Sequence, residues 1–503
     1  MGEITINLSE YRGQHVDISI RENRIIGYIP EAFADEPDDI LVTFHGKGNI
    51  FYIEDDEKCK VDHITVSFMG DNGIIYLSKN RHTYTFDAII EEGGACWFGR
   101  DVFMNKNIHG RLNIHVQVGH TVMVGHDCLF SLDVCINTDA NDNKPAGDIL
   151  LGNHVWIGQK VRIFGSSTVD GNVVIGANAS FGGQHLTSNA VWITKDETMV
   201  KANENVVFGK DSIRSRTKEK LKLYDVIDEK YLSDILNLAS HTPMTLLSDI
   251  KKTPDSSERL DIFKKYAETF EYVAPKYSSI RKKLKEKKVL EDNVIYGDYE
   301  PNPNLWVEFS GKGNVLIIEP GVKVGNIMVH FSGDRGLIFI GKSREAIYVE
   351  LEACTDANVY LGRDFQADEA PYPLLQATEN QTVLIGNQCK FGKGTWSRTS
   401  DQHPIWDIDT RKRINHGKGI FVGDKETVPP YEILLKGQNI GGMKGILRRD
   451  YLYKKAFNKL SSLKDMKKRI KWMLTLSESG AASRIQRVLK IGSKSELKKT
   501  VIE

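Results

Sequence analysis

A strict six-residue interval between apolar side chains constrains this chain more than any other feature of its sequence. The interval connects Leu151, Ile157, Ile163, Val169, Ile175 and Phe181. An α-helix repeats about every 3.6 residues and a strand about every two, so neither produces this period. A coil of three short parallel strands does, with one apolar side chain per face pointing inward. Each strand is too short to bury a core alone, so the coils must stack into a solenoid.

The second half of the chain repeats the first. FHGKGNIFYI at 44–53 returns as FSGKGNVLII at 309–318, and CWFGRD at 96–101 returns as VYLGRD at 359–364. VMVGHDCLF at 122–130 returns as VLIGNQCKF at 383–391, and the offset drifts only from 265 to 261. The copies are therefore collinear. The sequence predicts a mainly β protein built from two tandem parallel β-helices.

The segment between the two copies has a different pattern. After about residue 212, apolar residues recur at three-to-four spacing among many Lys and Glu, which indicates amphipathic helices. We predict a lead-in over 1–39, a first β-helix domain over 40–211 and a helical connector over 212–300. A second β-helix domain over 301–445 and a basic helical tail over 446–503 complete the chain.

Charge is balanced overall but concentrated at the end of the chain. The net charge is zero, yet residues 448–503 carry 16 basic and 5 acidic side chains. The tail is expected to cap the open end of the solenoid, to lie near anionic lipid through 448–499, or to bind an acidic polysaccharide. No nucleic-acid recognition module accompanies this charge, so nucleic acid is not an expected partner.

The compartment is predicted from absences in the sequence. The chain has no run of about 20 apolar residues and no signal-peptide pattern at its start. Its six cysteines form no CxxC motif, which is typical of thiols in a reducing compartment. Cys128 and Cys389 occupy equivalent positions in the two copies and are expected to be small core residues. We expect a cytoplasmic protein, working near the inner face of the membrane.

One loop in the second copy concentrates residues that could do chemistry. Between the coil positions 397 and 422, the segment 401–411 contains three aspartates, a histidine, a tryptophan and an arginine. An imidazole titrates near neutrality, and a neighbouring carboxylate fixes its tautomer, which is what general-base catalysis requires. The alternative is a solvated polar loop with an incidental histidine.

At SDQHPIWD (400–407), followed by RIN, this loop resembles the catalytic loop of bacterial hexapeptide-repeat O-acetyltransferases. These left-handed β-helix enzymes include galactoside, maltose, capsule and lipopolysaccharide acetyltransferases. The resemblance implies that His403 is the base, that Asp401 is the carboxylate close to it and that Asp407 closes the loop. Trp406 and Arg411 are then expected to contact substrate. The resemblance also supplies the left-handed winding, which the period of six does not determine.

The two copies depart from the family pattern in complementary ways. The first keeps GNHVWIG at 152–158, but its loop has Asn141 or Asp142 where the family histidine is expected. The second keeps the histidine loop, but has Lys-Glu-Thr at 425–427 where HVW is expected. We therefore hypothesise one composite site, with His403 from the second copy and the acyl-CoA wall from the first. Two alternatives remain open: the second copy acts alone, or both copies are scaffold.

The expected acyl-CoA wall consists of His154, Trp156, Gly158 and Lys160. Trp156 could instead pack against a neighbouring coil, and His154 fits a packing or hydrogen-bonding role. Lys160 and Arg162 could meet the CoA phosphates, although exposed cations are common.

The resemblance implies O-acetylation of a capsule or O-antigen polysaccharide, with acetyl-CoA as donor substrate and no metal. The protein is expected to be a homo-oligomer, because active sites in this family lie between subunits. One alternative is a non-catalytic scaffold in a glycan-assembly complex. Another is a γ-carbonic-anhydrase-like enzyme, because His82, His115 and His120 have a spacing similar to that of its zinc ligands.

Overall fold

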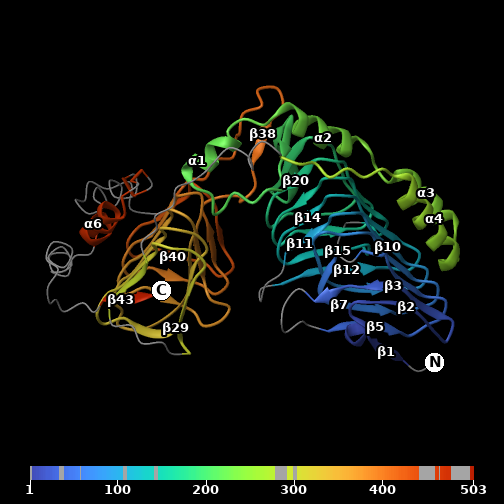
Figure 1. Cartoon of the computed structure of the whole chain (residues 1–503), viewed down its shortest axis with the longest axis horizontal. Helices are drawn as coiled ribbons and strands as arrows, with labels where there is room; N and C mark the ends of the chain where they lie inside the picture. Colours follow the sequence, from blue (N-terminus) through green and yellow to red (C-terminus); the bar gives the residue numbers. More distant parts are fainter. Residues whose placement is uncertain are drawn as a thin grey trace. The chain divides into compact units, whose positions relative to one another are not determined.

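The computed structural model describes residues 3–32, 39–56, 58–105, 110–140, 145–277, 292–297, 303–440, 459–460, 462–463, 465–476 and 499–502. The chain forms two compact units (Figure 1). The first contains Met1–Phe208, Ile227–Tyr277 and Asp407–Arg411, and the second contains Gly209–Val226, Ser278–Trp406 and Lys412–Glu503. Each is mainly β and consists of stacked, mostly parallel strands.

Three sheets form the sides of the first unit. The first sheet contains, in spatial order, β1 (Ile4–Asn7), β5 (Ile40–Phe44), β7 (Lys60–Phe68), β9 (Thr83–Ile90), β12 (Leu112–Val116), β15 (Val134–Asn137), β18 (Arg162–Phe164) and β21 (Ser180–Phe181), with β4 (Glu31–Ala32) beside β7. The second contains β2 (Gln14–Ile20), β3 (Asn23–Ile29), β6 (Ile50–Ile53), β8 (Ile74–Leu77), β10 (Ala95–Phe98), β13 (Thr121–Val124), β16 (Ile149–Leu151), β19 (Ser167–Val169) and β22 (His185–Leu186). The third contains β11 (Phe103–Met104), β14 (Leu129–Phe130), β17 (Trp156–Ile157), β20 (Val173–Ile175), β23 (Ala190–Lys195) and β24 (Thr198–Glu204), and β25 (Val206–Phe208) follows in the chain.

The register of these sheets explains the period of six. Ile157 of β17 pairs with Ile175 of β20, which is one coil of 18 residues later, and their sheet is parallel. Ile163 pairs with Phe181 in the same way on another face. Three steps of six therefore complete one coil, and each step places an apolar residue on a different face. The prediction of a mainly β protein with parallel sheets is confirmed, and β1 to β3 of the expected lead-in join these sheets through antiparallel pairings.

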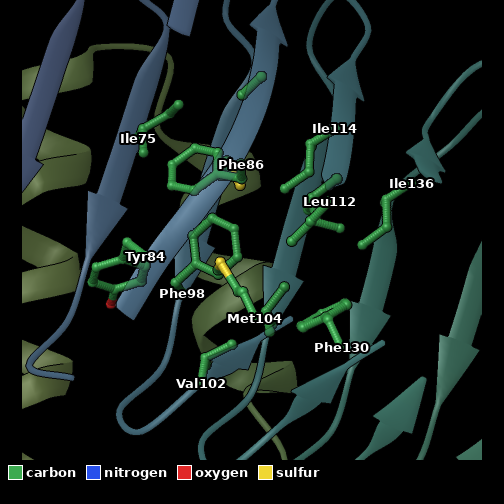
Figure 2. Close-up of a cluster of buried hydrophobic side chains, with 14 of the residues drawn as sticks. Ile75, Tyr84, Phe86, Phe98, Val102, Met104, Leu112, Ile114, Phe130 and Ile136 are labelled. Carbon is green, nitrogen blue, oxygen red and sulfur yellow. The ribbon is translucent and has the colours of Figure 1, made fainter. Parts of the chain in front are cut away.

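Inward-pointing side chains from all three sheets fill the core of the first unit. Figure 2 shows part of this core, where Phe86, Phe98 and Phe130 from successive faces converge with Ile136 and Met104. All five are at most 4 % exposed. Cys128 is also fully buried, as its position in the repeat predicted.

The second unit repeats this arrangement. One sheet contains β42 (Asn439–Ile440), β39 (Ile420–Val422), β35 (Thr382–Ile385), β32 (Asn358–Leu361), β30 (Leu337–Ile340), β28 (Val315–Ile318), β26 (Asn293–Tyr296) and the antiparallel β43 (Lys499–Ile502). Another contains β27 (Leu305–Phe309), β29 (Lys323–Phe331), β31 (Ala346–Ala353), β34 (Leu374–Ala377), β37 (Trp396–Arg398) and β41 (Ile433–Leu434). The third contains β33 (Gln366–Ala367), β36 (Lys390–Phe391) and β40 (Thr427–Val428), and β38 (Ile405–Asp407) lies in the histidine loop.

The longer helices of the described residues are α2 (Glu229–Ser240), α3 (Met244–Lys252) and α4 (Ser256–Thr269), between the two coil stacks in the sequence, and α6 (Met466–Leu476) in the tail. Shorter helical turns are α1 (Lys218–Leu221) and η2 (Lys222–Tyr224), before α2, and η1 (Leu8–Tyr11), near the start of the chain. Asp228 begins α2 and Asp255 begins α4 by accepting hydrogen bonds from backbone amides of the first turn. The apolar sides of α3 and α4 pack on the outer face of the sheet that contains β8 and β10, where Phe263 contacts Tyr76.

The tail helix α6 occupies the corresponding place in the second unit. Its residues Ile470, Met473 and Leu474 are buried against the outer face of the sheet that contains β30 and β32. The tail was expected to cap the open end of the solenoid, but α6 covers a side because that sheet presents apolar residues outward. The apolar stripe of α6 is therefore buried within the protein. Among the described residues, no helix is long and apolar enough to cross a membrane.

Candidate active site

The histidine loop leaves the second coil stack after β37 and returns at β39. Asn415 holds its two ends together with one side chain. Its Oδ1 accepts hydrogen bonds from the backbone N–H of Ile405 (2.7 Å) and from Arg413 Nε (3.1 Å). Its Nδ2 donates to the carbonyl of His403 (2.7 Å) and to Asp401 Oδ2 (3.1 Å). The backbone around His403 is therefore fixed by a residue twelve positions later.

A buried ion pair supports the same loop from below. Arg413 and Glu379 are 5 % and 4 % exposed, and Arg413 donates to both carboxylate oxygens, at 2.9 and 2.8 Å. Glu379 also accepts from Ser400 Oγ and from the backbone N–H of Gly417 (3.2 Å). The carboxylate thus connects the start of the loop, its return and the coil beneath. Removing either partner of this buried pair would leave a buried charge without compensation, so we expect such a change to destabilise the loop strongly.

His403 is partly buried between the loop and the segment that begins the second unit. Gly209 N–H donates to the carbonyl of Pro404 and Ile213 N–H to that of Gln402, both at 2.9 Å. Burial lowers the pKa of His403 to about 4, and the cations of Lys210 and Arg398 act in the same direction. The imidazole is therefore neutral at physiological pH, which is the form that can accept a proton.

The two aspartates assigned by resemblance have other partners in the structure. Asp401 accepts hydrogen bonds from Lys436 Nζ and from Asn415 Nδ2. Asp407 accepts from Thr410, from the backbone N–H at 2.7 Å and from Oγ1 at 2.6 Å, and these bonds lower its pKa. Asp407 therefore closes a tight turn. Its segment, Asp407–Arg411, belongs to the first unit.

The expected substrate contacts lie in contrasting environments. Trp406 has no exposed surface, and its Nε1 donates to the carbonyl of Tyr224 at 2.6 Å. The assignment of Trp406 as a substrate contact is therefore corrected to a supporting role, because its ring is covered on all sides. Arg411 is partly exposed and pairs with Glu229 at 3.4 Å.

Sequence reasoning missed the three residues that hold the loop, which are Glu379, Arg413 and Asn415. Two of them lie in the motif RIN, which was noted only as following the histidine. A buried arginine and asparagine in a loop of charged residues have no composition signal. Their importance appears only when Glu379, on the preceding coil, is placed beside them.

The expected acyl-CoA wall in the first unit is mostly buried. His154 is fully buried, bonds Asp127 at 2.7 Å and the carbonyl of Phe208 at 2.9 Å, and stacks on the Phe208 ring at 4.0 Å. Trp156 is 6 % exposed, and its Nε1 donates to Ser131 Oγ at 3.3 Å. The assignment of His154 as a cofactor contact is corrected to the hydrogen-bonding role that was its alternative.

Gly158 and Lys160 complete the comparison with that wall. A Cβ on Gly158 would lie 2.5 Å from the carbonyl oxygen of Ile175, so glycine is required here by the close approach of two coils. Lys160 is partly exposed, and burial lowers its pKa. Arg162 pairs with Asp133 at 2.9 Å. Of the four wall residues, Lys160 is the one that reaches the surface.

The remaining candidates do not form a site in the described residues. The histidines at 115 and 120 face Glu91 (3.2 Å) and Asp148 (3.8 Å), and the histidine at 82 lies edge-on to Phe103. No group of three or more His, Cys, Asp or Glu side chains in the described ranges is arranged to hold a metal ion. The positions Asn141 and Asp142, where the first copy lacks the histidine, lie outside the described residues.

The second unit is a stack of mostly parallel coils from which the clamped loop that holds His403 projects. No protein-family model matches the chain. Two curated relatives are similar in sequence to part of the chain. A polysialic acid O-acetyltransferase of Neisseria meningitidis is 25% identical over 127 residues, which is 25% of this chain and 58% of that protein. A polysialic acid O-acetyltransferase of Escherichia coli O1:K1 / APEC is 37% identical over 68 residues, which is 14% of this chain and 20% of that protein.

Two solved structures are also similar. The polySia specific acetyltransferase NeuO has 21% identity and a TM-score of 0.31, and the match covers 43% of this chain and 89% of that chain. The polysialic acid O-acetyltransferase OatWY has 16% identity and a TM-score of 0.24, and the match covers 40% and 96%. The sequence match spans at most 58% of the curated relatives. The two sequence relatives confirm the predicted resemblance to O-acetyltransferases of the capsule type.

Proposed function

We propose that this protein transfers an acetyl group from acetyl-CoA to a hydroxyl of a bacterial surface polysaccharide, with His403 as general base. The observation that carries the proposal is the loop around His403, which is fixed by Asn415 and keeps a neutral imidazole at the edge of a rigid coil stack. The relatives named above act on polysialic acid, so a carboxylated capsule polysaccharide is the acceptor class we propose. We also propose that both stacks wind left-handedly, as the resemblance implies.

The proposed reaction needs one proton acceptor and no covalent enzyme intermediate. The imidazole of His403 takes the proton of the acceptor hydroxyl as the oxygen attacks the thioester carbonyl. A C–O bond forms, the C–S bond breaks, and the CoA thiolate takes the proton back from the imidazolium. A backbone N–H of the coil edge would stabilise the oxyanion. Base catalysis of this kind contributes about 10²–10⁴-fold.

The electrostatics of the loop favour an acidic acceptor. Burial is the main reason that the imidazole of His403 is a weak base in the free protein, and the cations of Lys210 and Arg398 lower its pKa further. A carboxylate of a bound acceptor near these cations would offset their field and raise the pKa of the ring towards neutrality. Proton transfer is more efficient when the catalytic pKa lies near the working pH. A neutral acceptor would lack this effect.

The roles of the other predicted residues change within the proposal. Asp401 and Asp407 fix the loop rather than touch the reacting atoms. In the expected donor wall, Lys160 is a candidate contact for CoA phosphates, while Trp156 and Gly158 pack the coils. Two predictions stay untested: that the donor binds in the first unit and that the chain forms oligomers.

The test is acetyl transfer in vitro from labelled acetyl-CoA to oligosialic acid, with the ester detected by mass spectrometry. His403→Ala should lower kcat by about 10²–10⁴-fold. His416→Ala is the matched control, because His416 is an exposed histidine of the same loop that pairs with Asp225 at 3.9 Å. If both variants retain wild-type transfer, His403 is not the base. If the wild-type chain transfers nothing to acidic or neutral glycans, the scaffold alternative replaces the enzyme.

A further inference from the structure

The second unit has an open groove at one corner of its coils, formed by residues outside the histidine loop. The corner is formed by the turns that follow β30, β32, β35 and β39, one above another. The cavity there measures about 600 Å³. It is lined mainly by polar side chains, including Lys342, Arg344, Arg363, Asn387, Gln388 and Lys425. A second hollow of about 210 Å³ continues it beside Gln366.

The first unit contains the same corner with the same backbone. In three of these turns one residue adopts a left-handed conformation, and the φ values of the two copies agree within 6°. These residues are Asp101 (58°), Asp127 (61°) and His154 (57°) in the first unit, and Asp364 (53°), Gln388 (60°) and Lys425 (63°) in the second. The two corners therefore share a backbone conformation at these three positions and differ in what covers them.

In the first unit the protein itself fills this corner. Arg100 donates to a backbone carbonyl of α4 at 2.8 Å, and Asn153 donates to the carbonyl of His241 at 2.7 Å. The ring of His126 stacks on Phe270, with centroids 4.4 Å apart. His126 is 1 % exposed, so helix α4 and the residues after it cover this part of the corner. The same turns in the second unit line an open groove instead.

The charges of the groove leave a positive surface. The lining carries four cations and two carboxylates. Arg344 pairs with Asp364 at 3.2 Å and Arg363 pairs with Glu319, so the charges of these two arginines are compensated. The carboxylate of Asp424 accepts from the backbone N–H of Asn387 at 2.6 Å. Lys342 and Lys425 are exposed at opposite ends of the corner, three coils apart. Strands of successive coils are about 4.8 Å apart, which places these two cations roughly 14 Å apart along the stack.

We propose that this corner groove binds a segment of an acidic polysaccharide, separately from the histidine loop. The hydroxyl of Ser343 and the amides of Asn387 and Gln388, which come from two of the four turns, suit the hydroxyl groups of a glycan, and the cations suit its carboxylates. A nucleotide is less well matched, because none of the described residues that line the main cavity is aromatic and could stack on a base. The sequence after α6 has five basic and two acidic residues between 477 and 498, so it does not complement this groove in charge. The inference takes its ligand class from the proposed function.

The experiment measures binding without acetyl-CoA, so that it does not depend on catalysis. Full-length protein carrying His403→Ala is titrated calorimetrically with oligosialic acid and oligogalacturonate, and with the methyl ester of each as a neutral match. The groove variant is Lys342→Glu with Lys425→Glu. The control is Lys467→Glu, which reverses an exposed charge on α6 of the same unit. Thermal unfolding of each variant checks that the fold is intact.

We expect at least one carboxylated oligomer to bind more tightly than its ester, and the groove variant to weaken it about tenfold, since each exposed charge pair contributes modestly. The control should bind as the parent does, and added salt should weaken binding. Binding of neither acid, or binding that the groove variant leaves unchanged, overturns the inference. CoA binding that the groove variant abolishes also overturns it, because the groove is then a nucleotide site. Acidic binding without acetyl transfer by the wild-type chain would leave the groove standing and refute the proposed function.

Discussion

Replacing Asn415 by alanine tests the reasoning about the histidine loop most directly. The variant loses four hydrogen bonds and leaves the N–H of Ile405, which is 5 % exposed, without its acceptor. Arg413 Nε and the carbonyl of His403 lose partners at the same time. An unsatisfied buried donor costs about 1–3 kcal/mol, so we expect a loss of about 3 kcal/mol for the second unit. This corresponds to a fall of the order of 10 °C in its thermal transition.

The effect on transfer should exceed the effect on binding. A shift of the loop by about 1 Å is enough to reduce kcat by about 10²-fold, whereas KM for an acceptor bound elsewhere on the unit should change little. Asn439→Ala is the control, because Asn439 is an exposed asparagine of the same unit, at β42. The measurements are steady-state transfer and thermal unfolding of both variants. Equal kcat and equal unfolding temperature in the two variants would refute the clamp.

Four further predictions concern pH and buried charge. The kcat/KM of the free enzyme should fall on the acid side near pH 4 rather than near 6.5, because the neutral form of His403 is the base and its pKa is lowered to about 4. The lowered pKa of His403 also makes the free energy of unfolding depend on pH, because the unfolded state binds the proton more readily than the folded state. The contribution of His403 to stability is complete above the unfolded pKa of 6.5 and is lost as pH falls towards 4. Denaturant titrations of wild type and His403→Ala at several pH values should resolve this loss. Arg413→Met should destabilise by about 3–5 kcal/mol, and adding Glu379→Gln should recover part of this loss; an additive double variant would contradict the coupling. Arg469→Ala should make α6 sensitive to limited proteolysis and lower the free energy of unfolding by about 3 kcal/mol. The reason is that the buried guanidinium donates to three acceptors at 2.7–2.8 Å. Unchanged protease resistance would show that the apolar contacts of α6 are enough to hold the helix in place.

The tail helix also extends the internal repeat beyond the coils. Arg469 of α6 donates to the carbonyl of Ala357, and Arg259 of α4 donates to the carbonyl of Gly93 (2.6 Å). These carbonyls belong to equivalent turns of the two copies. The repeated unit is therefore a coil stack together with a helix that inserts an arginine into its side. Sequence comparison of the copies did not detect this, because the helices keep only the arginine and an apolar spacing.

The coil architecture could be predicted because an apolar residue recurs at every sixth position. Whether a side chain at Ile157 or Ile163 points inward depends on local geometry alone, and each step repeats it. The duplication was equally visible, because the same turn sequences return in the same order. The position of His403 in a projecting loop followed from the interruption of the repeat and from a family resemblance.

The environment of each candidate residue depended on segments that are distant in the sequence. Trp406 is buried because Tyr224, 182 residues earlier, accepts its N–H, and His154 is buried because Phe208 covers it. No local pattern records such contacts. The sequence by itself determined the repeating coil, its duplication and the loop that holds His403, since these depend on short-range periodicity. Only the tertiary structure decided which predicted residues reach solvent, which hold the loop in place and how strongly the imidazole holds a proton, because burial and charge depend on what the rest of the chain places around them.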